Sequence, residues 1–376
     1  MRKLLYLTFS MALIAALTTY AMWAADRPVG HYLSDLRIDL AVDQGTPADR
    51  GNLLGIQPEL FPTDYQSSER LHRKLAAYLQ KARDQDLLNE KTIVVLPEHI
   101  GTWLMVSGEK DELYQATTLK EAMNWLAASN PLKFIRALIG ATGDSRLDDA
   151  HLRMKAKGMA KDYQALFGGL AKEFHVTLVA GSIVLPEPSI IEGRLKIGGG
   201  ALYNSSVVFG RDGLPIGQPQ RQMHPVFDEH EVIAANGEQK LSVVDTPVGR
   251  LGVLIGSDSW YPDNYRKLDD QGAKFVAVPA FVTGHGTWDK PWRGYKGLST
   301  PGSVSIKPGE LSEGQAWHHL TLTAQPPGSQ AIAGMSVFLR GQFWDQGSAG
   351  QSFLSSNGQH FADGNARGAR LLNLWL

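Results

Sequence analysis

The sequence of 376 residues contains no cysteine, which excludes several kinds of site at once. Without a thiol the chain forms no disulfide, binds no metal through thiolate and carries no lipid on cysteine. A formal net charge of −1 leaves no basic field that would attract nucleic acid, so we expect no nucleic-acid partner. His224, His318 and His319 lack metal-ligand spacing with nearby carboxylates, and we expect neither a metal nor a cofactor.

Charged side chains are absent from Leu4 to Ala25, directly after Arg2 and Lys3. Such a run is either a secretory signal or a membrane anchor. Small residues permit signal cleavage after Ala21, but the run is also long enough to span a bilayer with Trp23 at its outer interface. In both cases we expect an exported protein, periplasmic or extracellular. If the segment is uncleaved, residues 4–25 tether it to the inner membrane.

The remainder of the sequence predicts a short tether and one folded domain. Residues 26–50 show no sustained hydrophobic period and contain several turn-formers, which is typical of a tether after the signal or anchor in residues 1–25. Regular patterns begin near residue 51 and continue to the end of the chain. We therefore expect a single domain over residues 51–376.

Helical and extended patterns alternate within this domain. Apolar residues at helical spacing predict helices over 71–82 and 159–174. Continuous apolar runs predict strands, as expected for an α/β layered domain; these are 52–57, 92–96, 176–180, 202–209, 250–255 and 274–281. Val244 and Arg250 flank a hairpin signal at Thr246-Pro247-Val248-Gly249.

Two long stretches exceed what a minimal domain of this kind needs. Residues 101–151 hold helix-like apolar clusters around Asn130-Pro131, and residues 283–313 are rich in Gly, Pro and Ser. Long irregular segments inside compact domains are usually functional or disordered. Because the second stretch contains Trp288 and Trp292, we expect a lid or a contact surface there.

Two motifs have the form of a catalytic site. Leu96-Pro97-Glu98 ends an apolar run in a carboxylate, and the segment from Leu251 to Pro262 reads as a buried strand that runs into a tight turn. Together they resemble the nitrilase, or carbon–nitrogen hydrolase, superfamily. The resemblance continues from Asn52 to the C-terminus through further matching segments, among them Leu53 to Gln57, Tyr203-Asn204-Ser205 with Asp212-Gly213, Val226-Phe227-Asp228-Glu229, Gly350 to Gly358 and Ala369 to Leu374.

The resemblance implies a fold, an activity and a catalytic triad. Members of the superfamily form a four-layer α-β-β-α sandwich, often as dimers or larger assemblies, so a homodimer is an expected partner. They hydrolyse nitriles and amides or transfer acyl groups with a glutamate, a lysine and a cysteine. The thiolate attacks the carbon, the glutamate moves the proton, and the lysine ammonium stabilises the oxyanion.

Only one triad member survives when this sequence is matched to those positions. Glu98 corresponds to the general base, Gln222 stands at the lysine position, and Gly256 stands at the cysteine position. A glutamine amide donates hydrogen bonds but carries no positive charge. Losing the nucleophile alone removes most of the catalytic acceleration. The sequence therefore predicts a catalytically inactive member of the superfamily.

Two serines flank the vacant nucleophile position and define an alternative. Ser257 or Ser259 would serve an active amidase or acyl-transferring enzyme with a rearranged site. Neighbouring residues of a strand point to opposite faces, so Ser257 is expected to aim away from Glu98. An alcohol also needs stronger activation than a thiol. We therefore favour the inactive protein.

The preferred hypothesis is a binding or scaffold protein that uses the old pocket around Glu98, Gln222, Gly256 and Trp260. Its expected ligand is small and amide-like. Ser257 and Asp258 belong to the same site, with Asp258 fixing the turn through backbone hydrogen bonds, and Glu229 is a further candidate for orienting a ligand. A third hypothesis makes residues 101–151 and the Trp288/Trp292 loop a docking surface for a membrane partner.

Overall fold

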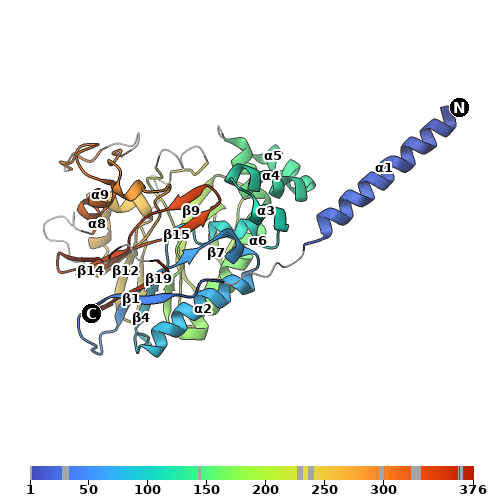
Figure 1. The fold of residues 1–376 in the computed structure, drawn as a ribbon. Coiled ribbons are helices and arrows are strands. Elements are labelled where there is room, and N and C mark those ends of the chain that lie inside the picture. The colour runs from blue at the N-terminus through green and yellow to red at the C-terminus, as the bar shows by residue number, and fades with distance from the viewer. Residues whose placement is uncertain are drawn as a thin grey trace.

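The computed structural model describes residues 2–27, 34–142, 145–226, 232–235, 241–295, 300–302, 304–322, 332–362, 364 and 367–376. Helix α1 (Arg2–Ala25) projects away from the rest of the protein, and none of its residues is buried (Figure 1). It is long and apolar enough to cross a membrane, a property shared by signal sequences at the same position. The remaining elements form a layered α/β domain.

The first of the two main sheets contains strands from both ends of the domain. Its strand order is β1 (Ile38–Gln44), β19 (Ala369–Trp375), β2 (Asn52–Gln57), β4 (Thr92–Val95), β5 (Thr177–Val179), β9 (Leu202–Phe209) and β10 (Pro215–Arg221), with β6 (Ile183–Pro186) also paired to β9. Strands β2, β4 and β5 run parallel, and every residue in each of them is buried. This is why they read in the sequence as continuous apolar runs.

The second sheet is assembled from the C-terminal half. Its order is β11 (Val243–Thr246), β12 (Gly249–Val253), β13 (Phe275–Ala280), β14 (Ala333–Phe338), β17 (Phe353–Ser356) and β18 (Gln359–Ala362). The expected hairpin is confirmed because β11 and β12 pair antiparallel through Thr246 and Gly249. Smaller sheets comprise β16 (Gln346–Ser348), β15 (Arg340–Phe343) and β3 (Glu59–Leu60), and separately β7 (Ser189–Ile191) and β8 (Arg194–Lys196).

Three apolar cores define four layers. One core lies between the two main sheets and includes Val95 and Val253. A second packs the first sheet against α2 (Ser68–Asp84) and α6 (Arg146–Phe174), and a third packs the second sheet against α8 (Pro262–Asp269) and α9 (Glu313–Leu320). The predicted four-layer α-β-β-α sandwich is confirmed.

The expected tether is wrong for part of its length. Residues 38–44 form β1, which pairs in parallel with β19 at the edge of the first sheet. The pairing places Ile38 opposite Ala369 and Val42 opposite Leu372. Only Val42 in this strand is buried, but Ile38, Leu40 and Val42 alternate with Asp39, Ala41 and Asp43, a short period of two that the prediction overlooked. Its partner lies at the far end of the chain, where no local pattern can reveal it.

Segment 101–151 folds into short helices on the same side of the domain as the end of α1 (Figure 1). These are the 3₁₀ helix η2 (Thr102–Val106) and the α-helices α3 (Asp111–Gln115), α4 (Leu119–Ser129) and α5 (Pro131–Gly140), followed by the start of α6. The predicted helical character is confirmed.

Segment 283–313 differs from the expected docking surface. Its tryptophans, Trp288 and Trp292, are 6% and 2% exposed and belong to the core beneath the second sheet. Trp292 contacts Trp260 and Tyr295 edge to face. The aromatic side chains therefore hold the segment onto the domain, and they are not available to dock a membrane partner.

Candidate functional site

Glu98 lies just beyond the C-terminal end of β4 and is 2% exposed. Its carboxylate accepts a hydrogen bond of 2.8 Å from Nδ2 of Asn204, which projects from β9. The same amide nitrogen donates to Oε1 of Gln222 at 3.0 Å. Asn204 thus joins Glu98 and Gln222, two of the positions that the resemblance assigns to the triad.

Gly256 begins a 3₁₀ helix, η3 (Gly256–Trp260), shortly after β12 ends at Val253. Its φ of +50° lies in the left-handed region, where glycine carries no steric penalty. A Cβ atom at this position would lie 2.8 and 2.9 Å from the two carboxylate oxygens of Glu98. The carboxylate of Glu98 therefore occupies the space that a side chain at position 256 would need.

Gln222 is 1% exposed and directly follows β10. Its backbone N–H donates to the carbonyl of Asn204 at 2.8 Å, which fixes the residue against β9. Its side-chain amide donates to Oγ of Ser257 at 3.5 Å, a long contact. The position supplies a neutral donor at the edge of the pocket and no fixed positive charge.

Ser257 differs from its expected orientation because η3, and not a strand, carries it. It lines the same pocket as Glu98, and its hydroxyl donates to the backbone carbonyl of His224. Because the carbonyl oxygen accepts this hydroxyl proton, the proton is not being transferred to Glu98. Ser259 is fully buried and donates to the carbonyl of Gly256 at 2.7 Å, so it faces the fold and not the pocket.

Asp258 binds backbone groups, as predicted, but these belong to Met223 and His224 and not to its own turn. Its carboxylate accepts the backbone N–H groups of Met223 and His224 at distances of 2.8 to 3.0 Å, and it is completely buried. These bonds tie the chain after Gln222 to η3. Burial and the nearby Asp258 charge raise the pKa of Tyr261, whose ring stacks on His224, so this hydroxyl stays protonated at neutral pH.

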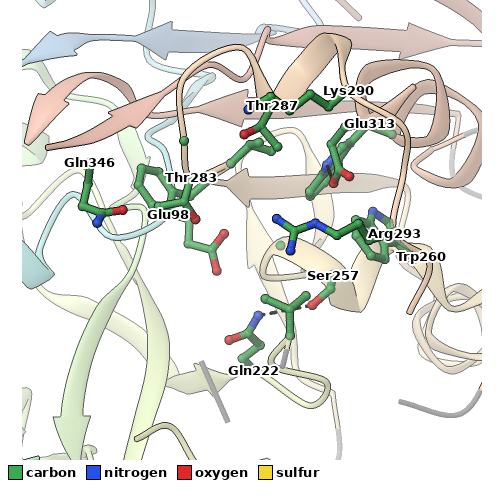
Figure 2. A pocket seen from close by; sticks show the side chains of 16 residues that line it. Glu98, Gln222, Ser257, Trp260, Thr283, Thr287, Lys290, Arg293, Glu313 and Gln346 are labelled. Atoms are coloured by element: carbon green, nitrogen blue, oxygen red, sulfur yellow. Dashed lines mark hydrogen bonds between the residues drawn. The ribbon is translucent and has the colours of Figure 1, made fainter. Parts of the chain in front are cut away.

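These residues surround a pocket of about 350 Å³ (Figure 2). Glu98, Gln222, Gly256, Ser257 and Trp260 all line it, as the sequence predicted. The remaining walls come from the segment after β13, from α9 and from β16. Asp258, also predicted to belong to the site, does not line the pocket, because its carboxylate is turned towards the backbone of Met223 and His224. Glu229, a further predicted site residue, lies outside the described residues.

Cationic side chains that sequence reasoning missed also line the pocket. Lys290 and Arg293 come from segment 283–313, and Figure 2 shows the Arg293 guanidinium extending into the space between Glu98 and Ser257. Asn204, which holds Glu98, was likewise not singled out for the site. Its place in a matching strand segment was a usable signal, whereas nothing in the sequence around Arg293 indicated its position.

The side chains at this site suit a polar organic ligand. Across the described part of the chain, no group of three or more histidine, aspartate or glutamate side chains is placed to hold a metal ion. Two acids, two amide groups, three hydroxyls and two cations instead line the pocket together. Such a set offers acceptors for ligand N–H groups and donors for carbonyl or anionic oxygens.

A family model for carbon-nitrogen hydrolases matches residues 54–295, well over half of the chain. The chain belongs to the carbon–nitrogen hydrolase family. This match includes Glu98, Gln222 and Gly256, and it ends at Tyr295, just beyond Arg293. The resemblance found from the motifs is thereby confirmed.

Curated relatives match over short stretches. Probable hydrolase YhcX of Bacillus subtilis is 28% identical over 119 residues, which cover 32% of this chain and 21% of that protein. Deaminated glutathione amidase of Yersinia enterocolitica is 43% identical over 54 residues, or 14% of this chain and 19% of that protein. The chain thus matches about a fifth of the length of each relative.

Solved structures extend the fold comparison to most of the domain. A mutant amidase from Nesterenkonia sp. AN1 in complex with acrylamide aligns with a TM-score of 0.52 and 12% identity, over 88% of this chain and 93% of that one. Another mutant, carrying the acetamide moiety of fluoroacetamide on its active site cysteine, aligns with a TM-score of 0.52 and 14% identity over the same shares. At this identity the likeness establishes the shared fold.

Proposed function

We propose that this chain is an exported, membrane-anchored member of the carbon–nitrogen hydrolase family that has lost hydrolysis and binds a small amide-like ligand. It would act as a binding or scaffold protein through the pocket around Glu98. The observation that carries this proposal is that the Glu98 carboxylate lies 2.8 Å from where a Cβ of residue 256 would stand, so the acid fills the volume from which a nucleophile would have to act.

The lack of a reactive nucleophile supports the loss of hydrolytic activity. Gly256 has no side chain, and the Ser257 hydroxyl donates to the carbonyl of His224. Gln222 supplies no charge at the position where the family resemblance implies a lysine. A tetrahedral oxyanion would therefore lack both its attacking atom and the ammonium expected to stabilise it.

The polar walls of the pocket support a binding role. Glu98 is held by Asn204 and presents an acceptor to ligand N–H groups, while Arg293 and Lys290 line other walls as donors. A primary amide, alone or in a molecule that also carries a carboxylate, matches this arrangement of acceptor and donors. Burying such a ligand leaves few of its polar groups without a partner.

Helix α1 supports the export and anchoring part of the proposal. It is a 24-residue apolar helix at the N-terminus, and no part of it is buried in the domain. A signal-peptidase site after Ala21 would separate this helix from the domain, whereas an intact helix would retain the protein at the membrane. The mass of the protein purified from whole cells would distinguish the two outcomes.

Hydrolysis and binding would be tested on the same purified protein. We would measure ammonia release and thermal stabilisation with acetamide, propionamide, glutamine and N-acetylglutamine. We expect no ammonia above background, together with a raised melting temperature for at least one amide. That stabilisation should disappear in Glu98→Ala and Arg293→Ala, and it should persist in Asp245→Ala, whose carboxylate is 85% exposed and lies outside the pocket. Enzyme-like ammonia release abolished by Glu98→Ala would refute the inactivity, and no stabilisation by any amide would refute the binding role.

A second candidate function is a serine-based amidase or acyl-transferring enzyme, and one observation favours it. The hydroxyl of Ser257 and the guanidinium of Arg293 line the same pocket as Glu98, which brings an alcohol, a cation and an acid together. This mechanism would require Ser257 to exchange its bond to the His224 carbonyl for one to Glu98. A covalent adduct with an amide-directed probe, detected by intact-mass spectrometry and absent from Ser257→Ala, would establish this serine-based mechanism.

A further inference from the structure

We propose that helix α5 lies in the surface of the lipid bilayer beside the point where α1 leaves it. Its apolar face would enter the boundary between headgroups and acyl chains, while its basic residues contact anionic headgroups. This inference rests on the retained anchor proposed above. It goes beyond that proposal because it gives the folded domain its own contact with lipid and a fixed orientation.

The end of α1 is fastened to the domain and does not lead into a free linker. Nζ of Lys110 donates to the carbonyl oxygens of Trp23 at 2.7 Å and of Asp26 at 2.6 Å, and it lies 4.6 Å from the centre of the Trp23 ring. Arg27 forms an ion pair with Glu109, whose side chain is 1% exposed. The exit of the anchor therefore has a defined place on the domain surface.

That place adjoins the start of α5. Arg27 also donates to the carbonyl of Ser129 at 3.2 Å and to Oδ1 of Asn130 at 3.4 Å. Asn130 directly precedes α5, and the Trp23 ring lies 6.1 Å from that of Trp125 in α4. If α1 spans the bilayer with Trp23 at the interface, α5 begins at the membrane surface.

The outer face of α5 is apolar and uncovered in the described structure. Leu132, Ile135 and Ile139 are 83%, 56% and 79% exposed, and their spacing of three and four residues places them on one face. The other side of the helix is occupied, because Phe134 packs on His151 of α6 with ring centres 4.8 Å apart. Leu147, 59% exposed at the start of α6, adds to the uncovered apolar surface.

Charge favours lipid as the occupant of this face. Lys133 and Arg136 are exposed, and α5 carries no acidic residue. An amphipathic helix with a basic flank and bulky aliphatic residues is the type that lies in a bilayer interface. Long basic side chains can also reach the headgroups while their stems cover apolar surface. A second copy of the chain is the competing occupant, and the experiment below would detect it.

The cysteine-free sequence permits a direct test with single labelled cysteines. Full-length Ile139→Cys, labelled with an environment-sensitive fluorophore, would be reconstituted in phosphatidylcholine–phosphatidylglycerol vesicles that contain nitroxide-labelled lipid. Leu13→Cys in α1 reports whether the anchor is in the bilayer, and Leu214→Cys, 54% exposed in the turn after β9, serves as a matched apolar surface control. We expect strong quenching and a blue-shifted emission at positions 13 and 139, and neither effect at position 214.

The outcomes separate this inference from the proposals on which it rests. Quenching at position 13 with emission at position 139 equal to that at position 214 would overturn the α5 contact while leaving the anchor intact. An unquenched label at position 13 would refute the anchor and the α5 contact together. Spontaneous disulfide crosslinking between two copies of unlabelled Ile139→Cys, combined with an unquenched label at that position, would replace lipid by a second copy. None of these results depends on ligand binding in the pocket.

Discussion

The carboxylate of Glu98 lies within 2.8 Å of the point where the side chain of residue 256 would begin. In a working triad of this type the acid and the nucleophile need separate space, because the acid must exchange a proton with an atom beyond that Cβ. Here the acid has taken the space, Asn204 holds it there, and the backbone of Gly256 has the left-handed conformation that suits glycine.

Substituting Gly256 should destabilise the protein more than its backbone conformation alone requires. We expect Gly256→Ala to lower the free energy of unfolding by about 2–3 kcal/mol, because the new methyl group collides with Glu98. Gly193→Ala is the matched control: φ is +70° there, and no described atom lies within 4 Å of the added Cβ, so only about 1 kcal/mol should be lost.

A double-mutant cycle would test whether the additional loss of stability in Gly256→Ala comes from Glu98. The cost of Gly256→Ala should fall by about 1 kcal/mol or more in a Glu98→Ala background, since truncating the acid removes the collision. Urea unfolding of the four proteins measures this coupling. Additive effects of the two substitutions would mean that the Glu98 side chain moves aside without a cost in stability.

Asn204→Asp should place a second buried carboxylate beside Glu98. The present amide donates to Glu98 and Gln222, whereas an ionised aspartate only accepts, so both bonds are lost and like charges face each other. We expect a loss of about 2 kcal/mol or more at pH 7. Because burial and repulsion would raise the folded-state pKa of the pair, the deficit relative to wild type should shrink as pH falls to about 5. A deficit unchanged between these pH values would contradict the repulsion.

The buried ion pair between Lys74 and Asp64 should matter far more than an exposed one. The two groups are 2.8 Å apart, with side chains 1% and 0% exposed. Lys74→Met would leave the Asp64 charge buried and uncompensated, so we expect a loss of about 3–5 kcal/mol. Arg211→Met breaks a pair with Glu90 whose side chains are 43% and 85% exposed, and it should cost less than about 1 kcal/mol. Chemical denaturation of both variants makes the comparison.

His360 should make the protein less stable in mild acid. Burial, with a smaller contribution from the charge of His318, lowers the pKa of His360 from 6.5 to about 4. The unfolded chain therefore binds a proton at a pH where the folded protein does not. This contribution to stability is complete above pH 6.5 and declines as pH falls towards 4.

Replacing the ring should flatten that pH dependence. His360 stacks on Phe353 with ring centres 5.3 Å apart, so His360→Phe preserves an aromatic contact while removing the titration. We expect a smaller loss of stability between pH 7 and pH 5 than in wild type, measured by thermal unfolding. His285→Gln, at an exposed histidine, is the control substitution. Equal slopes for His360→Phe and wild type would exclude His360 as the source.

Local patterns predicted much of the fold. Strands β2 and β9 and helix α2 were found because consecutive buried residues or a helical period reveal such elements within a short window. Asp258 was correctly assigned to backbone bonding, but the N–H groups that it binds, those of Met223 and His224, lie 35 and 34 residues earlier and were not identified from the local turn. Strand β1 was missed because its period of two, from Ile38 to Val42, is too short to be distinctive. Its pairing with β19 could not be predicted locally, since β19 lies at the opposite end of the sequence.

The candidate site was likewise predicted in part. Motif order placed Glu98, Gln222 and Gly256 at one pocket, and the structure brings them together there. The orientation of Ser257 was predicted from strand alternation, which does not apply to the 3₁₀ helix that carries it. The burial of Trp288 and Trp292 and the entry of Arg293 into the pocket follow from how segment 283–313 packs, which its composition does not specify.

The sequence by itself determined that position 256 carries no sulfur atom and position 222 no positive charge, because no arrangement of the backbone changes what a glycine and a glutamine contain. Tertiary structure decided what surrounds these two positions. Only the packing of β4, β9 and η3 against one another moves the Glu98 carboxylate to Gly256 and aims Asn204 at it. Steric exclusion and hydrogen bonding act between atoms that meet in space, and residues 98, 204 and 256 meet only in the folded chain.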